Sequence, residues 1–478
     1  MKYITAACIL QSILCTLVYT QCPTPCKCPD SKTIDCSSTN SIPRPPTKLT
    51  QYTNFIMRGT QLSNIPYNAF ENYPSLLHID MKQNQIRSVS SQAFDKILFL
   101  SSLDLSNNKL TAMPGNLFVR ISTLAELDLS NNKLTAIPGN LFVRISTLAE
   151  LFLSNNNIQT IDSNAFKSLD SLKILKLDNN AITKIPYNTL KNLKQISTLY
   201  LNFNKINQIP DSAFTGAINL KILDLQSNRI AAISKNLLQP ANLLKLISLN
   251  RNRITSIEDG SFNSNLMLEH IDLNGNMLTK ISKKTFGSLS KLVELDLGYN
   301  AISSISAKTF ANLKQLHVLM LTSNCVTSIT DSAFKDLMSL KTLLLSSNRL
   351  TVIKDNTLKG LNNLVFINLF NNYLACTSSK AFTSATKLQT LHSNFSKACC
   401  GIPASVTCMP RVPANCAGNS GTTCLNVMAT PPPASGMCSR SIPPTGTTNN
   451  AVRTENKANQ IMIFAISIAI TLLSTMPA

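Results

Sequence analysis

The sequence contains no tryptophan, and aromatic residues make up only 6% of its 478 residues. It also lacks the cysteine and histidine spacings of a zinc site, a glycine-rich phosphate loop and a recognisable nucleophile motif. The residues therefore offer no support for the common metal-dependent, nucleotide-dependent or covalent enzymes, and we expect no cofactor. At this length we expect several domains or a repeat array rather than one globular core.

Cysteine is nearly missing from the middle of the chain, where Cys325 is the single cysteine between residues 37 and 375. Residues 1–20 have the features of a secretory signal: Lys2, an apolar run, and Val18 and Thr20 at the positions before cleavage. The run is shorter than the roughly 18 residues that a membrane span needs. Secretion leads to an oxidising compartment, so the clustered cysteines near both ends are expected to form disulfides.

The other end carries the apolar run IMIFAISIAITLL, residues 461–473, with no basic residue after it. A spanning helix normally has Lys or Arg on its cytoplasmic side. Small residues around Asn449 and Asn450, a polar spacer and an apolar tail are typical of a glycosylphosphatidylinositol signal. We predict that 451–478 is removed and that a Thr/Pro-rich stalk, 425–450, is left attached to the membrane through a lipid anchor.

Self-similarity dominates the region between these ends. Thirteen asparagines follow one another at intervals of 24 residues without an insertion, from Asn84 to Asn372, each in the frame LxxLxLxxNxL. This frame resembles that of leucine-rich-repeat proteins. The resemblance implies an α/β-type solenoid (horseshoe) over 49–375, with a parallel concave sheet, a mostly irregular or short-helical convex side, and disulfide-stapled caps.

The repeat also predicts the interior. Leucines at period two point to one side of a short strand, and successive strands stack about 4.8 Å apart. The Asn column is expected to donate hydrogen bonds to backbone carbonyls of its own and the next coil. Ten residues after each Asn position comes a column that is mostly phenylalanine, from Phe70 to Phe334. At this register we expect the rings in the core rather than at a ligand.

The first four cysteines after the signal have the spacing C-x3-C-x-C-x7-C, within a predicted cap at 21–48. Two disulfides over the first coil would cover the end of the core. The motif resembles the cysteine-rich N-terminal cap of extracellular leucine-rich-repeat proteins. That resemblance implies the pairs Cys22–Cys28 and Cys26–Cys36.

A second cysteine-rich cap is predicted at 376–424, although the family signature N-P-W-x-C-x-C is absent. We expect its six cysteines to form disulfides with unassigned pairing: Cys376, Cys399, Cys400, Cys408, Cys416 and Cys424. Cys438 in the stalk is either a free thiol or an interchain bridge. For Cys325 we favour an unpaired thiol, with a bridge to another chain as the alternative. Asn394-Phe-Ser is one sequon for glycosylation, on the C-terminal cap.

Function is then expected on the exposed side of the strands. Over the coils, the positions six, four, two and one residue before each Asn hold ten acidic and four basic residues, a net charge of −6, while the whole chain has +20. This reversal predicts a basic or mixed-charge ligand, protein or glycan, for the concave face. Apolar clusters interrupt the acids, as at binding hot spots. The candidate ligand-binding residues are Asp80, Asp104, Glu126, Asp128, Glu150, Phe152, Tyr200, Phe203, Asp272, Glu294, Asp296, Met320 and Leu344.

Two adjacent repeats, 105–128 and 129–152, are identical except at Met113/Ile137 and Asp128/Phe152. The first difference is a conservative core exchange, and the second falls on the predicted concave face. A scaffold that is copied whole while its exposed face changes is typical of a recognition array.

The same residues are compatible with other functions to a lesser degree. Asp104 and Asp128 would stack about 4.8 Å apart, close to the carboxylate separation of retaining glycosidases, but an open face gives little enclosure for catalysis. Calcium bridging between stacked carboxylates is a minor alternative, and we expect no metal. A basic row just after the Asn column is either a solvated face or a site for sulfated polyanions; its members are Lys109, Lys133, Lys205, Arg229, Arg253 and Arg349. We expect no nucleic acid partner.

Capped 24-residue repeats, a Thr/Pro stalk and a lipid anchor together resemble the variable lymphocyte receptors of jawless vertebrates, and SNNKLTAIPGNLF resembles their variable modules. The resemblance implies a cell-surface, immune-type receptor that binds antigens on its concave face, and not an enzyme. Toll-type ectodomains share the repeat but end in a spanning helix and a signalling domain. A fixed, germline-encoded adhesion or pattern-recognition protein is the alternative.

Overall fold

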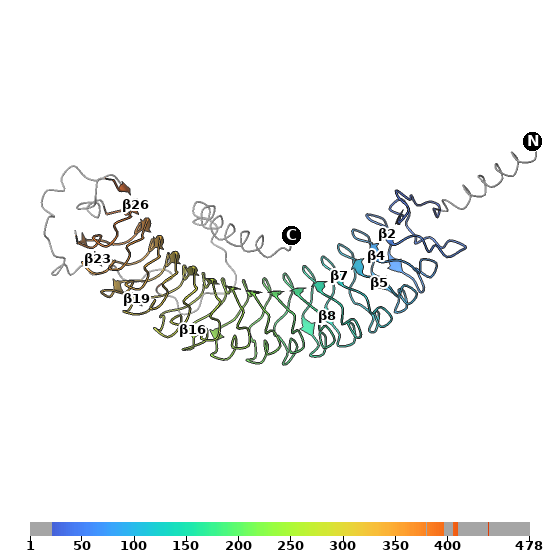
Figure 1. The fold of residues 1–478 in the computed structure, drawn as a ribbon, viewed down its shortest axis with the longest axis horizontal. Helices are drawn as coiled ribbons and strands as arrows, with labels where there is room; N and C mark the ends of the chain where they lie inside the picture. Colours follow the sequence, from blue (N-terminus) through green and yellow to red (C-terminus); the bar gives the residue numbers. More distant parts are fainter. Residues whose placement is uncertain (1–21, 379, 396–404, 410–437, 439–478) are drawn as a thin grey trace, which may run out of the picture. The chain divides into compact units, whose positions relative to one another are not determined.

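The computed structural model describes residues 22–378, 380–395, 405–409 and 438. The chain divides into two compact units, Met1–Pro432 and Pro433–Ala478. Cys438 is the one described residue of the second unit, so the fold is that of the first. Its coils follow an arc, with one long sheet on the inner side (Figure 1).

Each coil contributes one short strand to a 17-stranded sheet, and every pairing in it is parallel. Neighbouring coils pair in register, so that Leu127 lies opposite Leu151. In order along the sheet, the strands are β1 (Thr33–Asp35), β2 (Asn54–Ile56), β4 (His78–Asp80), β6 (Ser102–Asp104), β7 (Glu126–Asp128), β9 (Glu150–Phe152), β11 (Ile174–Lys176), β12 (Thr198–Tyr200), β13 (Ile222–Asp224), β15 (Leu246–Ser248), β17 (His270–Asp272), β18 (Glu294–Asp296), β20 (Val318–Met320), β22 (Thr342–Leu344), β24 (Phe366–Asn368), β26 (Thr390–His392) and β27 (Thr407–Met409).

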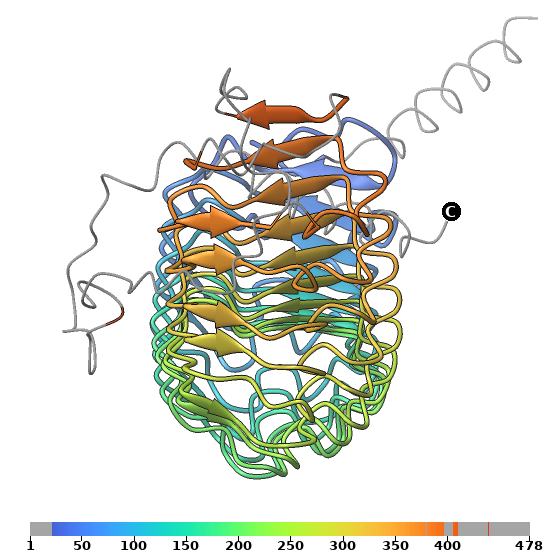
Figure 2. The same ribbon diagram turned by 90° about the vertical axis from the view of Figure 1, so that its left-hand side faces the viewer.

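The opposite, convex side is made of turns and two-residue strands, seen facing the sheet across the coil in Figure 2. The strands form five parallel pairs: β3 (Asn64–Ile65) with β5 (Ser88–Val89), β8 (Ala136–Ile137) with β10 (Thr160–Ile161), β14 (Ala232–Ile233) with β16 (Ser256–Ile257), β19 (Ser304–Ile305) with β21 (Ser328–Ile329), and β23 (Val352–Ile353) with β25 (Cys376–Thr377). The described residues contain no α-helix, so the convex side is irregular rather than short-helical.

Proline explains part of the interrupted pattern on the convex side. In the β8–β10 pair, Asp162 donates its backbone N–H to Ile137 O at 3.0 Å. One and two coils later the same position holds Pro186 and Pro210, which have no N–H to donate. The outer ladder is accordingly missing between β10 and β14, apart from a single bridge between Lys184 and Gln208.

The interior contains the predicted columns. The phenylalanine side chains are at most 1% exposed, and consecutive rings stack, as for Phe94 and Phe118, whose centroids lie 6.4 Å apart. The rings are therefore core, as expected. The Asn column is also present, but its direction differs from the prediction. Asn156 Nδ2 donates to Leu153 O of its own coil at 3.1 Å and to Leu129 O of the preceding coil at 3.0 Å, and its Oδ1 accepts from Leu134 N, also of the preceding coil.

The cysteine pairs Cys22–Cys28 and Cys26–Cys36 are confirmed. Cys36 is fully buried, and Cys26 and Cys28 pack against the core, so the disulfides cover the first coil.

Cys325 is disulfide-bonded, as are Cys376, Cys408 and Cys438. The expectation of an unpaired Cys325 is therefore wrong, and neither Cys325 nor Cys438 is a free thiol available for a bridge to another chain. Sequence spacing could not reveal this, because disulfide partners are brought together only by the fold.

Several predictions fall outside the described residues: the signal, Cys399, Cys400, Cys416 and Cys424, most of the stalk, and the anchor signal with Asn449 and Asn450. Asn394 is described and exposed, and its side-chain amide bonds to the backbone of Asn372. Within the described part of the chain, no helix has the length and hydropathy needed to cross a bilayer.

Candidate ligand-binding face

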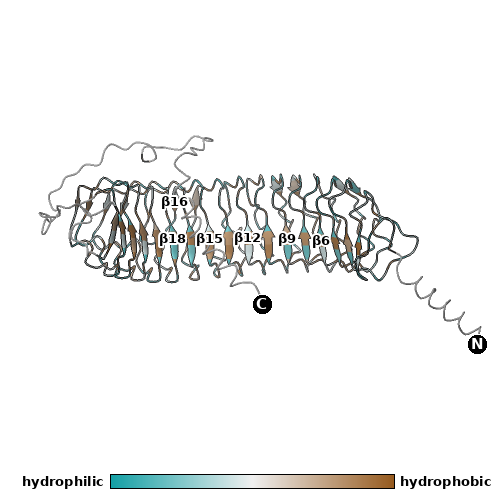
Figure 3. Cartoon of the chain, turned by 90° about the horizontal axis from the view of Figure 1, so that it is seen from above, coloured by the Kyte–Doolittle hydropathy of each residue, from teal (hydrophilic) through white to brown (hydrophobic). Residues whose placement is uncertain are grey.

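The concave face consists of the outward-pointing residues of the sheet strands and the turns that follow them. In the sheet strands from β1 to β26 the middle residue is buried. The flanking residues lie on the outward side, as in β7, where Leu127 is fully buried between Glu126 and Asp128. Period-two alternation on a stacked sheet causes this. Twelve of the thirteen candidate residues occupy outward strand positions, and Phe203 lies in the turn after β12. Figure 3 looks onto this face, along which hydrophilic and hydrophobic strands alternate.

The structure brings five side chains of successive coils into one line, which we call the central row. The sheet register places Asp128, Phe152, Lys176, Tyr200 and Asp224 opposite one another in this order. Lys176 Nζ lies 4.9 Å from the centroid of the Phe152 ring and 5.8 Å from that of Tyr200. A cation between two aromatic faces is attracted to both quadrupoles. Sequence reasoning considered Lys176 only for its charge and did not place it among the candidate residues. Its spacing of 24 residues from both Phe152 and Tyr200 is the signal that could have identified it.

The acids at the N-terminal end of the face are largely neutralised. Asp80 Oδ2 forms ion pairs with Arg58 Nη2 at 2.6 Å and with Lys82 Nζ at 3.4 Å. Lys82 Nζ also lies 3.6 Å from Asp104 Oδ2. These contacts use both basic residues of that region. Asp80 and Asp104 are therefore poorer attractors for a basic ligand than their charges alone indicate.

Glu126, Asp128 and Glu150 have no such partner, since within the described residues no Lys or Arg lies within 4.0 Å of their carboxylates. Burial, together with the neighbouring charge of Glu150, raises the pKa of Glu126. Burial also raises the pKa of Asp128, against hydrogen bonds from Ser130. These three carboxylates form the unpaired acidic patch beside Phe152.

At the other end of the central row, burial raises the pKa of Asp224 to about 6. The same cause raises the pKa of Asp296 to about 6, and burial and the charge of Asp296 raise that of Asp272. Side-chain amides donate to the last two acids: Asn274 Nδ2 lies 3.2 Å from Asp296 Oδ2, and Asn250 donates to Asp272. Asp224 accepts a hydrogen bond from the backbone N–H of Gln226 at 2.9 Å.

Three C-terminal candidates are not accessible. Asp272, Glu294 and Met320 are each 3% exposed, and Glu294 Oε2 lies 3.3 Å from His270 Nδ1. Their assignment to an exposed binding surface is therefore corrected. Leu344 is half-buried. No cluster of three or more metal-ligating side chains occurs among the described residues.

Phe203 lies in the left-handed turn that recurs directly before the column Asn in every coil from Gln83 to Asn371. Its φ is 54°, in the left-handed region, and its side chain is 43% exposed. The equivalent position in other coils is often asparagine, such as Asn131 with φ 55°, because asparagine tolerates this region better than bulky residues do. Because Arg251 and Tyr299 share this conformation, each with φ 53°, the exposure of the Phe203 ring, rather than backbone strain, distinguishes this residue.

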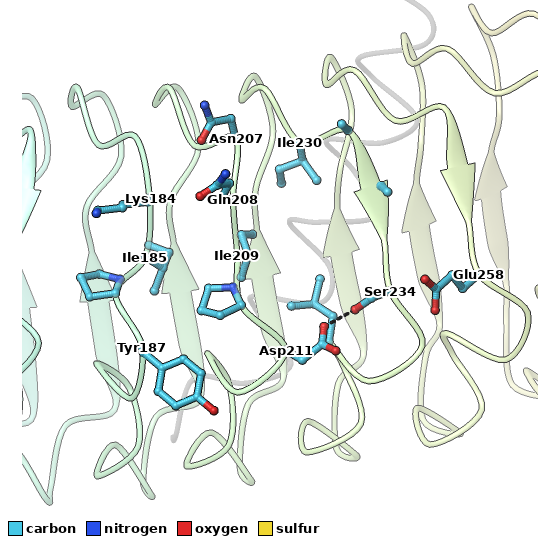
Figure 4. A pocket seen from close by; sticks show the side chains of 15 residues that line it. Lys184, Ile185, Tyr187, Asn207, Gln208, Ile209, Asp211, Ile230, Ser234 and Glu258 are labelled. Carbon is cyan, nitrogen blue, oxygen red and sulfur yellow. Dashed lines mark hydrogen bonds between the residues drawn. The ribbon is translucent and has the colours of Figure 1, made fainter.

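A pocket of about 700 Å³ lies on the convex side, where the outer ladder is missing (Figure 4). Ile185, Ile209 and two prolines form much of its wall, and Tyr187 lies at one side. Its carboxylates are already used by the solenoid: Asp211 accepts from Ser234, and Glu258 accepts from Lys235 N at 2.9 Å. Both acidic side chains of the pocket are therefore committed to hydrogen bonds within the solenoid.

Comparisons with known proteins agree with this architecture. A family model described as leucine rich repeat matches in eight overlapping segments that together run from residue 99 to residue 392. No curated protein sequence matches the chain significantly.

Solved structures are similar in fold. A leucine-rich-repeat protein of Leptospira interrogans superposes with a TM-score of 0.60 and 24% identity, covering 72% of this chain and 84% of that one. The complex of TLR13 with a single-stranded RNA gives 0.56 and 23%, covering 75% and 54%. The Toll–Spatzle complex of Drosophila gives 0.53 and 20%, covering 71% and 52%. The chain thus spans about half the length of these two receptors. Because the family model covers more than half of this sequence, the chain belongs to the leucine-rich-repeat family.

Proposed function

We propose that the protein is a cell-surface recognition receptor of immune type, which binds a basic or mixed-charge protein or glycan on its concave face. The observation that carries the proposal is the central row, in which two aromatic rings and a lysine lie between acidic residues of neighbouring coils. Aromatic side chains supply much of the binding energy at interfaces, and surrounding charges select and orient the partner.

The unpaired acidic patch supports a cationic partner. Glu126, Asp128 and Glu150 lie next to Phe152 in the sheet register and have no ion-pair partner among the described residues. A ligand that supplies Lys or Arg would relieve their mutual repulsion. On the concave face, the two nearly identical repeats differ only in having Asp128 or Phe152 at the same register position, as modular diversification of a binding face would produce.

The known neighbours are compatible with this proposal at the level of fold. Toll is bound to the protein Spatzle in its structure, and TLR13 is bound to a single-stranded RNA. For this chain we favour a protein or glycan over nucleic acid, since an acidic face repels phosphates. A solenoid with an open, stacked sheet is a binding scaffold, and we assign it no catalytic role. Substitution of Phe152 or Tyr200 in the central row tests the proposal through its effect on ligand affinity.

Membrane attachment is proposed from the sequence of the C-terminal end. Phosphatidylinositol-specific phospholipase is expected to release the protein from intact cells, because a glycosylphosphatidylinositol anchor is cleaved at its phosphodiester. Released protein is measured by immunoblot of the medium, with a transmembrane protein of the same cells as the control. Retention on the treated cells would argue for a spanning helix instead.

A diversified receptor and a fixed one can be separated by sequencing many transcripts of the gene from one animal. For an immune receptor we expect variation concentrated at outward strand positions such as 128, 152 and 176, over constant Leu, Asn and Phe columns. One invariant sequence in all cells would favour the fixed adhesion or pattern-recognition protein.

A further inference from the structure

The turns that follow the strands of the concave sheet carry a charge pattern of their own. Because all strands are parallel, these turns lie along one edge of the sheet (Figure 3). We consider the residues directly before the column Asn, directly after it and three after it. Over thirteen coils these positions contain no Asp or Glu. They contain eight basic residues, which define the basic edge: Arg87, Lys109, Lys133, Lys205, Arg229, Arg251, Arg253 and Arg349.

The densest part of the basic edge spans three adjacent coils. Lys205, Arg229 and Arg253 occupy the same position in consecutive repeats, and Arg251 lies two residues before Arg253. All four are exposed. Within the described residues, none of them has a carboxylate within 4.0 Å. Four exposed cations that no internal acid neutralises form a site for anions.

The arrangement is linear. Successive coils are about 4.8 Å apart at the sheet, so Lys205 to Arg253 covers about 10 Å, and the extension to Lys109 covers about 30 Å. Two uncharged residues, Asn157 and Ala181, interrupt the row. A long, flexible polymer with charges along its length can follow such a row, whereas a single small anion would contact only one or two of its members.

Two observations favour a sulfated polysaccharide over a nucleic acid. Single-stranded nucleic acids are held by successive aromatic platforms beside a basic groove. The positions that define the edge hold three aromatic residues, Phe203, Tyr299 and Tyr373, and no two of them lie in neighbouring coils. The commonest other residues at these positions are threonine and asparagine, such as Thr135, Thr183 and Asn179. Their side chains hydrogen-bond to hydroxyl and sulfate oxygens without requiring a base.

We propose that the basic edge binds a linear sulfated polysaccharide, independently of the ligand of the concave face. The acidic face and the basic edge would let the receptor hold a matrix polyanion and a cationic ligand at the same time. This separation of charge is the reason that a chain with a net charge of +20 can still attract a basic partner to its concave face.

The test uses the full-length protein and immobilised heparin as the probe. The triple variant Lys205→Gln, Arg229→Gln, Arg253→Gln is expected to weaken heparin binding about tenfold or more, and to lower the slope of log K against log salt by about 2, because fewer counterions are released. The matched control removes three exposed cations from convex turns: Lys167→Gln, Lys191→Gln, Lys335→Gln. The control is expected to keep its affinity, although its net charge changes equally.

Three results would overturn the proposal: no heparin binding by the wild type, equal losses in both triple variants, or equally tight and edge-dependent binding of a single-stranded oligonucleotide. Circular dichroism checks that both variants are folded. Tyr200→Ala is expected to leave heparin binding unchanged, so the failure of this proposal and that of the concave-face proposal can be told apart.

Discussion

Replacing Asn156 by alanine is expected to lower the free energy of unfolding by about 3 kcal/mol or more. The buried side chain donates to Leu129 O and Leu153 O and accepts from Leu134 N, at 3.0 to 3.1 Å. Alanine leaves Leu134 N inside the solenoid without a partner, which costs about 1–3 kcal/mol. It also removes one of two hydrogen bonds from each carbonyl, because Leu129 O keeps the bond from Asn132 and Leu153 O keeps the bond from Asn180; each lost bond contributes about 1 kcal/mol. Because each Asn joins its own coil to the preceding one, the loss also weakens the interface between two repeats.

The control is the next residue. Asn157 is exposed, and alanine keeps its backbone bond to Leu134 O, which is 2.9 Å long. We expect Asn157→Ala to change stability by less than about 0.5 kcal/mol. Chemical denaturation followed by circular dichroism measures both variants, and midpoints are compared because repeat arrays need not unfold in two states. Similar midpoints for the two variants would refute the structural role of the Asn column.

The second large effect is expected in ligand binding. Tyr200→Ala and Phe152→Asp are each expected to reduce affinity about 30-fold or more, which corresponds to about 2 kcal/mol. Phe152→Asp reproduces the residue of the sister repeat at position 128, so the scaffold tolerates it at that register. Neither substitution touches the leucine core, and we therefore expect both proteins to keep the wild-type denaturation midpoint.

A ligand for this measurement is selected by probing the wild-type protein on arrays of extracellular proteins and glycans, and affinities are then measured by surface plasmon resonance. Tyr187→Ala is the matched control, since Tyr187 is 64% exposed on the convex side. Lys176→Met keeps the apolar stem between the rings and removes the charge, which separates packing from electrostatics. Ligands that depend on Tyr187 but not on Tyr200 would exclude the concave face as the binding site.

The repeat made most of the fold predictable. A 24-residue period with leucines at period two dictates parallel strands in register, since any shift of one residue would turn leucines such as Leu127 toward solvent. The same period placed the phenylalanine column in the core. The N-terminal disulfides followed from the resemblance of their spacing. These features depend on residues that recur every 24 positions. Because the coils stack in register, residues separated by 24 positions are in contact in the structure.

The candidate site was less predictable, for a physical reason. Sequence position shows which side chains reach the concave face, but it does not show which partners they meet there. Pairing of Asp80 with Arg58 and Lys82, and the placement of Lys176 between two rings, depend on side-chain directions across neighbouring strands.

The period of the sequence thus determined the solenoid, its core and the face that is offered to a ligand, because those follow from repetition and local geometry. Only the tertiary structure decided that Asp272, Glu294 and Met320 are buried and that Cys325 is disulfide-bonded. It also decided that, among the described residues, Glu126, Asp128 and Glu150 have no ion-pair partner beside Phe152. Burial, disulfide pairing and charge neutralisation are properties of side chains brought together from different coils, and no repeat encodes them alone.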